Sequence, residues 1–381
     1  MKKKLLFIVH SLKKGGGAEK TVSTLTIQLS RNYNISLLTI YDFKTNYPYS
    51  GNYYSLRENL GIKRFILNSL KISTIIRPFR IYKHIRQISP DVIISNMDVT
   101  NTYVIISKIL FRYKIPLIIT THTNPKIAYR KGKRHTNVFI KFFYSLKIID
   151  KIITVSKELQ KIFEYEYKIK KKKIKTIYNS IDLERIRELK KEKILNSKKV
   201  FDDASTIKFI TVGSLREVKG HEYLIEAFSG VKQQIPNSKL IIIGEGPLRR
   251  KLEQKIKELD LSNDALLLGL RKNPYKYLAN SDIFVFSSLY EGFGIVLVEA
   301  LACEIPIIST DCEAGPREIL DNGKNGILVN VMDIADLRNK MILLAKNNDL
   351  IDYYTKDSLK RAEFFDSRRI IDKWIEIIES I

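Results

Sequence analysis

The chain has 381 residues, of which 44% are hydrophobic, and a formal net charge of +25 at pH 7. This length suggests two domains, and the hydrophobic content suffices for two buried cores, which excludes a globally disordered chain. Residues 1–190 hold 38 Lys and Arg against 12 Asp and Glu, whereas residues 191–381 hold 28 against 29. Because all of the excess positive charge lies in the first half, we expect the two halves to do different work.

The chain begins with a basic and then apolar stretch, MKKKLLFIVH, as a secretory signal peptide would. Its apolar run is short, is followed by His10, Lys13 and Lys14, and lacks a small-residue cleavage site, so it favours a buried strand. No apolar run approaches the roughly 20 residues that cross a bilayer. Cys303 and Cys312 lack CxxC spacing and nearby histidines, so we expect two buried thiols and no zinc site. These features predict a cytoplasmic protein that is either free or bound to a membrane surface.

Short apolar runs rich in β-formers alternate with longer helical patterns along almost the whole chain. Such runs, separated by helical periodicity, are typical of parallel sheets covered by helices on both faces. The fold class is therefore α/β, with two doubly wound, Rossmann-like domains in tandem. The expected strands are 5–9, 35–40, 91–95, 116–120 and 151–155 in the first half, and 207–213, 239–244, 265–269, 282–287 and 306–310 in the second.

A charged segment without a strand pattern, residues 183–206, separates the two series of strands. We therefore expect a first domain over residues 1–182 and a second over residues 183–366. Residues 367–381 carry isoleucines and a tryptophan at helical spacing, which predicts an amphipathic closing helix. Ligands of doubly wound domains bind at the carboxyl ends of the strands, so the natural site is a cleft between the two sheets.

Two strand-end loops of the first half carry candidate site residues. Gly16 and Gly17 precede a helical pattern that starts near Thr21, and such a turn lets the backbone approach an anion. A plain tight turn is the alternative. His122 follows the strand 116–120 in a polar loop, where it either faces a ligand or is a hydrogen-bonded structural histidine. His221 carries no comparable signal.

The second half holds stronger candidates. Lys219 precedes a helical pattern, where a lysine reaches a phosphate while helix N–H groups bond the same oxygens; a solvated lysine is the alternative. Glu299 stands on the otherwise apolar helix 295–302, where a carboxylate is costly to bury unless hydrogen bonds are donated to it, as a ribose diol would do. The turn from Gly292 to Ile295 offers backbone N–H groups to a diphosphate.

Glu291 and Glu299 form an E-x7-E pair, and the segment EGFGIVLVEALA resembles the signature of retaining glycosyltransferases of the GT-B fold, family 4. The resemblance covers nearly the whole chain. It implies two Rossmann-like domains facing a cleft, a nucleotide-sugar donor bound mostly by the second domain and an acceptor bound by the first. It also implies no metal or other cofactor, and a C-terminal helix that crosses back to the first domain. The other segments on which the family resemblance rests are GGGAE, TTHTN, IYNSIDL, VGSLREVKGHEYLIEAF, IIIGEGPLRRKLE, LLLGLRKNPYKYLANSDIFVFSS and STDCEAGPREIL.

The resemblance also implies roles for single residues. Lys219 would neutralise the donor diphosphate and Glu299 would hold the ribose hydroxyls. Glu291 would contact hydroxyls of the transferred sugar, and His122 would lie near the reacting anomeric carbon. The remaining implied donor contacts are the backbone of Phe293, Gly294 and Ile295, and the loop of Gly16 and Gly17.

The chain departs from the family pattern at two positions. The family often has an arginine where this chain has Ser214, so Arg216 would have to replace it. Glu304 stands where the family usually has a glycine, in a peripheral position.

The excess positive charge falls in three segments. Residues 126–147 hold seven Lys and Arg and no acid, residues 168–175 hold six lysines, and Arg77, Arg80, Lys83 and Arg86 recur at every third position. Basic amphipathic helices with aromatic residues are typical of membrane surfaces, where each cation contributes about 1 kcal/mol. We therefore expect an anionic membrane surface as partner, at the inner face of the plasma membrane. Nucleic acid, for which no binding signature is found, and a solvated basic surface are the alternatives.

The leading hypothesis is a glycosyltransferase that moves a hexose or N-acetylhexosamine from a nucleotide sugar, with UDP favoured over GDP, to a lipid-linked or other membrane-associated glycan. This reaction would serve the synthesis of cell-surface polysaccharide, lipopolysaccharide or glycan precursors. Retention by front-face substitution is implied by the family resemblance. The alternatives are an epimerase or a phosphorylase of the same fold, and a nucleotide-binding regulator without catalysis.

Overall fold

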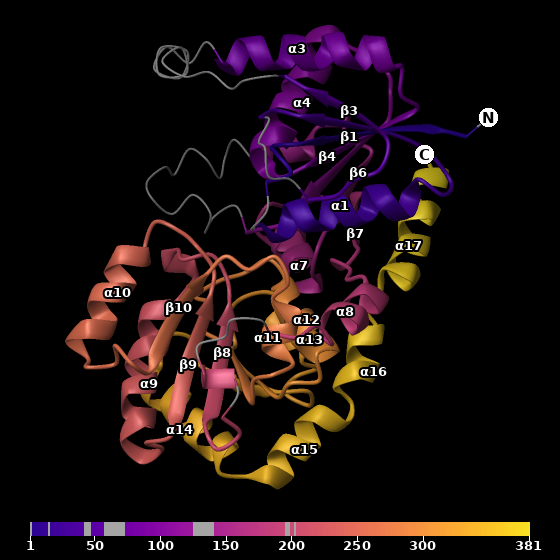
Figure 1. Ribbon diagram of the computed structural model, residues 1–381. Helices are drawn as coiled ribbons and strands as arrows, with labels where there is room; N and C mark the ends of the chain where they lie inside the picture. The colour runs from indigo at the N-terminus through magenta and orange to yellow at the C-terminus, as the bar shows by residue number, and fades with distance from the viewer. Residues whose placement is uncertain are drawn as a thin grey trace. The chain divides into compact units, whose positions relative to one another are not determined.

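The computed structural model describes residues 2–13, 16–41, 47–56, 73–124, 141–194, 199–201 and 203–381. The chain divides into two compact units (Figure 1). Unit 1 consists of Met1–Ser180 and Ser367–Ile381, and unit 2 consists of Ile181–Asp366. The chain passes from one unit to the other after residue 180 and returns after residue 366, whereas the sequence suggested residues 182 and 366.

Unit 1 contains, within its described residues, a parallel sheet in the order β3-β2-β1-β4-β5-β6-β7. The central strands are buried on both faces, as expected for parallel strands between two helical layers. The strands are β1 Lys4–Val9, β2 Asn34–Thr39, β3 Asn52–Ser55, β4 Val92–Asn96, β5 Leu117–Thr121, β6 Lys151–Thr154 and β7 Ile174–Thr176. The helices are α1 Gly17–Leu29, α3 Ser73–Ile88, α4 Asp98–Phe111, α7 Lys157–Tyr165, the 3-10 turn η1 Lys171–Lys173 and α17 Ser367–Glu379.

The closing helix α17 belongs to unit 1, and the expected return of the C-terminus to the first domain is confirmed. Its apolar side, with Ile370 and Trp374, joins the core that β1 and α1 form, and Figure 1 shows α17 beside α1. The far end of α17 is tied down by Glu379, which accepts a hydrogen bond from Tyr33 Oη at 2.7 Å and pairs with Lys3 Nζ at 2.8 Å.

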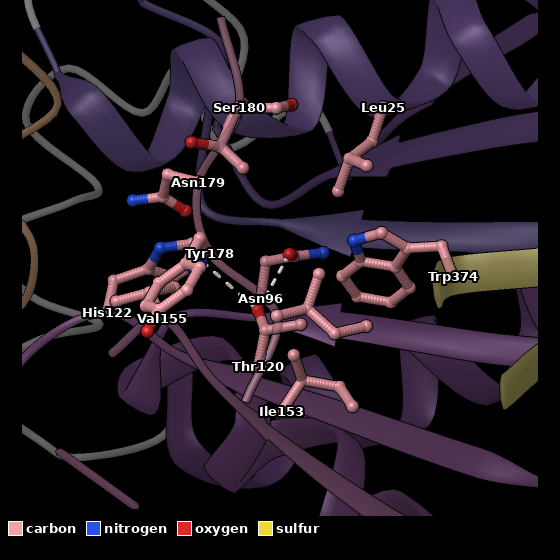
Figure 2. Close-up of a pocket in the computed structure, with 12 residues that line it drawn as sticks. Leu25, Asn96, Thr120, His122, Ile153, Val155, Tyr178, Asn179, Ser180 and Trp374 are labelled. Carbon is pink, nitrogen blue, oxygen red and sulfur yellow. Dashed lines mark hydrogen bonds between the residues drawn. The ribbon is translucent and has the colours of Figure 1, made fainter. Parts of the chain in front are cut away.

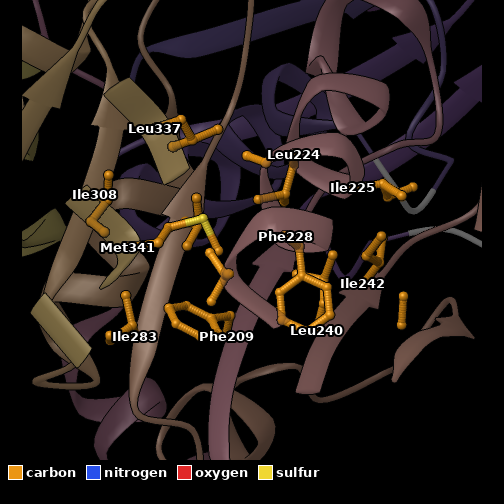
Figure 3. Close-up of a cluster of buried hydrophobic side chains, with 14 of the residues drawn as sticks. Phe209, Leu224, Ile225, Phe228, Leu240, Ile242, Ile283, Ile308, Leu337 and Met341 are labelled. Carbon is orange, nitrogen blue, oxygen red and sulfur yellow. The ribbon is translucent and has the colours of Figure 1, made fainter. Parts of the chain in front are cut away.

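Unit 2 contains a second parallel sheet, in the order β10-β9-β8-β11-β12-β13. Its core lies between the sheet and the helices α9 and α14, with Phe209, Phe228 and Met341 at the centre (Figure 3). Cys303 and Cys312 are buried free thiols, as predicted. The strands are β8 Ile207–Val212, β9 Ser238–Ile243, β10 Ala265–Gly269, β11 Ile283–Phe286, β12 Ile307–Thr310 and β13 Ile327–Val329. The helices are α8 Leu183–Leu189, α9 His221–Gln234, α10 Arg249–Glu258, α11 Tyr275–Leu278, α12 Ile295–Ala302, α13 Pro316–Ile319, α14 Ile334–Ala345, α15 Asn348–Lys356 and α16 Ser358–Glu363, with 3-10 turns η2 Lys199–Phe201 and η3 Glu217–Lys219.

The predicted α/β class with two doubly wound sheets is confirmed, and the ten expected strands are all present in the sheets. Sequence analysis missed β3, β7 and β13, which are the shortest or most polar strands and all lie at sheet edges. An edge strand needs only one neighbour and a small buried surface, so its sequence carries little apolar signal. β7 also overlaps the lysine-rich segment 168–175. Among the described residues, no helix combines the length and the apolar composition needed to span a bilayer.

Candidate active site

The strand order of unit 2 reverses between β8 and β11, and ligands of doubly wound sheets bind at the carboxyl ends of strands at such a reversal. β8 leads through residues 213–216 and η3 into α9, and β11 leads through residues 287–294 into α12. These two connections meet because adjacent parallel strands end on the same side of the sheet. The predicted donor residues that they carry are Arg216, Lys219, Glu291, Phe293, Gly294, Ile295 and Glu299.

Lys219 and Glu291 form an ion pair at the centre of this region. Lys219 Nζ lies 2.5 Å from Glu291 Oε1, and Ser288 Oγ donates a hydrogen bond to the same carboxylate oxygen at 2.9 Å. Lys219 Nζ also lies 5.6 Å from the centre of the Phe286 ring. The two charged side chains are only 21% and 15% exposed. The structure therefore joins two residues that the family resemblance assigned to different parts of the donor.

The backbone of the two connections is held in close contact around Gly220. Gly220 has φ +62°, and a Cβ there would lie 2.0 Å from the carbonyl oxygen of Ser287. Leu289 N–H donates to the carbonyl of Val218 at 2.8 Å, and Ser287 Oγ donates to the carbonyl of Lys219 at 2.9 Å. Only glycine allows this approach, so the Lys219–Gly220 turn is fixed relative to the loop of Glu291.

The loop of Glu291 ends at the N-terminus of α12. Gly294 is the N-cap residue, has φ +87° and provides no side-chain cap to the first N–H groups of the helix. Gly315 packs against the loop so closely that a Cβ there would lie 1.7 Å from the carbonyl oxygen of Phe293. The start of α12, from Gly294 to Ile295, can therefore present backbone N–H groups to an anion.

Glu299 lies one turn further along α12 and is only 5% exposed, among apolar neighbours. Tyr275 Oη lies 3.4 Å from Glu299 Oε1, a long hydrogen bond. Arg216 is exposed at the start of η3, where its carbonyl accepts from the N–H of Lys219 at 3.0 Å. Whether Arg216 takes the place of the arginine expected at Ser214 stays a prediction.

Sequence reasoning overlooked His221, the first residue of α9. It is 3% exposed, and its Nδ1 lies 3.2 Å from the carbonyl oxygen of Lys219. Burial lowers the pKa of His221 to about 4, so the imidazole is neutral at pH 7 and adds no charge beside Lys219. Its position directly after the Lys219–Gly220 turn was the signal that could have identified it.

The strand order of unit 1 reverses between β1 and β4, and the other predicted residues lie near this second reversal. Gly16 is the N-cap of α1 and Gly17 its first residue; Gly15 lies outside the described residues. A Cβ on Gly16 would lie 1.9 Å from the carboxylate of Glu19, so the glycine leaves room for that side chain.

His122 follows β5 and borders a small cavity inside unit 1 (Figure 2). Thr120 Oγ1 donates to Asn96 Oδ1 at 2.7 Å and lies 3.2 Å from His122 Nε2. Because the threonine proton is used, Nε2 is assigned as the donor, which leaves His122 Nδ1 as an acceptor. This atom is buried without a hydrogen-bond partner among the described residues. Burial lowers the pKa of His122 to about 4, so the imidazole is neutral at pH 7 and its Nδ1 can accept a hydrogen bond. The polar residues around the cavity include Thr21, Asn96, Thr120, His122, Tyr178, Asn179 and Ser180.

Comparisons with known proteins cover both halves of the chain. The family model described as Glycosyltransferase Family 4 matches residues 15–185, and the model described as Glycosyl transferases group 1 matches residues 192–361. An uncharacterized glycosyltransferase of Methanocaldococcus jannaschii, MJ1059, is 35% identical over 341 residues, which cover 80% of this chain and 82% of the relative.

A second relative is named N-acetylgalactosamine-N,N'-diacetylbacillosaminyl-diphospho-undecaprenol 4-alpha-N-acetylgalactosaminyltransferase, from Campylobacter jejuni. It is 32% identical over 371 residues, which cover 96% of this chain and 97% of the relative. The solved structure of Anabaena Alr3699/HepE in complex with UDP and glucose has a TM-score of 0.78 at 19% identity and covers 100% of both chains. At that identity the likeness shows the fold alone. This chain therefore belongs to glycosyltransferase family 4 and is a glycosyltransferase of the GT-B fold.

Proposed function

We propose that this glycosyltransferase moves a hexose or N-acetylhexosamine, with retention, from a UDP-sugar to a lipid-linked glycan acceptor. The observation that carries the donor half is the Lys219–Glu291 pair beside the N-terminus of α12. A cation and free helix N–H groups suit a diphosphate, and a carboxylate in the same place suits sugar hydroxyls. UDP is favoured because Anabaena Alr3699/HepE, which has the same fold, was solved in complex with UDP and glucose.

In this proposal the donor diphosphate replaces Glu291 as the partner of Lys219, and Glu291 then accepts hydrogen bonds from the transferred sugar. Lys219 and the start of α12 stabilise the negative charge that grows on the leaving diphosphate, which is the role a metal ion has in other enzymes. His122 Nδ1 accepts a hydrogen bond from a hydroxyl group of the bound sugar near the anomeric carbon. Retention follows from front-face attack, in which the leaving phosphate takes the acceptor proton.

Glu299 is proposed to bind the ribose diol, and its substitution tests the donor site. With UDP at a hundredfold excess over its Kd, the native chain should gain about 2.7 kcal/mol of stability, and Glu299→Gln should gain clearly less. The measurement is thermal unfolding with and without UDP, with GDP and ADP as alternative ligands. Glu318→Gln, on the short helix α13, is the control and should keep the full shift. An unchanged shift in Glu299→Gln would refute the ribose role.

The acceptor half of the proposal rests on relatives and on a surface of unit 1. The Campylobacter relative is named for an undecaprenol-diphosphate acceptor. A lipid-linked acceptor would place the enzyme at the inner face of the plasma membrane, with its basic half toward anionic lipid. The epimerase, the phosphorylase and the non-catalytic regulator have no support from the relatives described above, which are all named as glycosyltransferases.

The predicted basic stripe on α3 needs a correction. Arg77 is 6% exposed and donates hydrogen bonds to the hydroxyls of Tyr41 and Tyr103, both at 2.6 Å, so it cannot meet a membrane. Ile85, on the same helix, is 1% exposed and belongs to the interior. The largest part of the basic segment 126–147 lies outside the described residues.

A different surface, formed by α3 and α4 together, suits a membrane better. Phe79 and Leu110 are 59% and 58% exposed, and the Phe79 ring lies 5.9 Å from that of Phe111, the last residue of α4. Lys83 on α3 and Lys114, just after α4, are exposed as well. Residues 73–90 and 99–149 contain no Asp or Glu, so no acid in these segments opposes anionic lipid. We call Phe79, Lys83, Leu110, Phe111 and Lys114 the α3–α4 patch.

Neutralising the two lysines of the α3–α4 patch tests the membrane part of the proposal. With about 1 kcal/mol per cation, Lys83→Gln/Lys114→Gln should weaken binding to phosphatidylglycerol vesicles roughly thirtyfold. Vesicle co-sedimentation measures this, and Lys257→Gln/Lys360→Gln on unit 2 is the matched control. Equal binding of the patch variant and the native chain, or equal binding to phosphatidylcholine vesicles, would argue against the patch.

A further inference from the structure

The buried carboxylate of Asp98 is hydrogen-bonded next to His122, and the family resemblance assigns Asp98 no role. Asp98 is the first residue of α4 and is 8% exposed. Tyr144 Oη donates to its Oδ1 at 2.7 Å and Thr123 Oγ1 donates to its Oδ2 at 3.3 Å. Asp98 therefore holds Thr123, the residue that directly follows His122 in the chain.

A second buried side chain extends the contact to the strand itself. Asn101, one turn along α4, donates through Nδ2 to the carbonyl of Thr120 at 2.9 Å and to Tyr144 Oη at 3.0 Å. Thr120 is the residue whose hydroxyl sets the tautomer of His122. Asp98 and Asn101 thus contact Thr123 and Thr120, which lie on either side of His122 in the chain.

The backbone places the Asp98 carboxylate where a buried negative charge is tolerable. Met97, just before it, has φ +74°, an uncommon value for a residue other than glycine. The turn at Met97 puts Asp98 at the N-terminus of a 14-residue helix, whose dipole favours a carboxylate. Burial raises the pKa of Asp98, while the hydrogen bonds from Tyr144 and Thr123 act in the opposite direction. The two hydroxyl donors and the N-terminus of α4 therefore stabilise the negative charge of Asp98, as a positively charged partner would.

We propose that Asp98 is a positioning residue for His122. Its carboxylate fixes the turn of residues 121–123, so that the neutral imidazole keeps Nδ1 aimed at the sugar. This inference rests on the proposed function, because it concerns a donor sugar that His122 contacts. Misplacement of such a group by about 1 Å is enough to lower a rate roughly 10²-fold.

A double-mutant cycle tests the proposal. Asp98→Asn should lower kcat for sugar transfer about 10²-fold, while the Kd for UDP, which is bound in unit 2, stays unchanged. His122→Ala should show a similar loss. The double variant should lose no more than the larger single loss, because Asp98 acts only through His122.

Asp150→Asn is the matched control. Asp150 accepts a hydrogen bond from the N–H of Leu117 at 2.8 Å, at the opposite end of β5 from His122, so its loss perturbs the same strand without touching the turn. The kcat of Asp150→Asn should stay within a few-fold of the native value. If Asp98→Asn does not fold, Tyr144→Phe and Thr123→Val remove single donors and enter the same cycle.

Two kinds of result overturn different statements. If the losses of kcat multiply in the double variant, the positioning role is refuted and the proposed function stays intact. The same holds if His122→Ala is impaired while Asp98→Asn is fully active. A fully active His122→Ala refutes the contact between His122 and the sugar, and this inference with it. A native chain that transfers no sugar from UDP-sugars refutes the proposed function.

Discussion

The Lys219→Ala variant is expected to bind UDP roughly 10–100-fold more weakly than the native chain and to transfer sugar about 10²–10³-fold more slowly. The affinity loss corresponds to one charge-assisted hydrogen bond, about 1.5–3 kcal/mol. The further loss in rate reflects the charge that grows on the diphosphate only as the sugar leaves, which a pre-positioned cation stabilises. The position of Lys219 is pre-set by the Gly220 turn.

Titration calorimetry with UDP and initial rates with UDP-sugars measure both effects. Lys232→Ala is the control, because Lys232 is similarly exposed and pairs with Asp264 at 2.7 Å elsewhere in unit 2. Lys219→Arg keeps the charge and should recover part of the affinity, although its planar donors fit a different geometry. Normal UDP binding by Lys219→Ala would show that the diphosphate lies elsewhere.

The Glu291→Gln variant is expected to change binding and turnover in opposite directions. Glu291 holds Lys219 in the ligand-free chain, so UDP has to displace a carboxylate before it can bind. Glutamine keeps the shape of the side chain and removes its charge, so UDP should bind about tenfold more tightly. Sugar transfer should fall about 10²-fold, because the hydroxyls of the transferred sugar lose the charged acceptor that orients them.

The same two measurements, UDP affinity and initial rate, test this variant. Glu304→Gln is the matched control, because Glu304 pairs with Lys190 in the same unit and has no proposed donor contact. It should leave both quantities unchanged. Weaker UDP binding by Glu291→Gln would contradict competition between Glu291 and the diphosphate, and unchanged turnover would contradict the sugar contact.

Much of the candidate site could be predicted because the fold brings the loops that carry its residues to one side of the sheet. Parallel strands end on one side of their sheet, so the loops that follow β8 and β11 meet wherever the strand order reverses between them. Because Lys219 follows one of these strands and Glu291 follows the other, the sequence predicts that the two residues lie near each other. Glu299 was identifiable for a separate reason, since a charge in an apolar helix needs an explanation.

Other features had no local signal. The sequence distinguishes neither Asp98 from a surface acid nor Arg77 from its exposed neighbours on α3, because each is buried by residues far away in the chain. Asp98 meets Tyr144, 46 positions later, and Arg77 meets Tyr41, 36 positions earlier. The edge strand β7 was hard to recognise because it overlaps the lysine-rich segment 168–175, and its own Lys175 is exposed at the edge of the sheet.

The sequence by itself determined the fold class, the order of the strands along the chain and the loops in which a ligand would be found. Its information is periodic and local: apolar runs select strands, and glycines select turns. Only the tertiary structure decided which charged groups pair, as Lys219 does with Glu291, and which polar groups are buried, as Asp98 is behind His122. These outcomes depend on how the elements pack, because a side chain is buried or paired by neighbours that its own stretch of sequence does not contain.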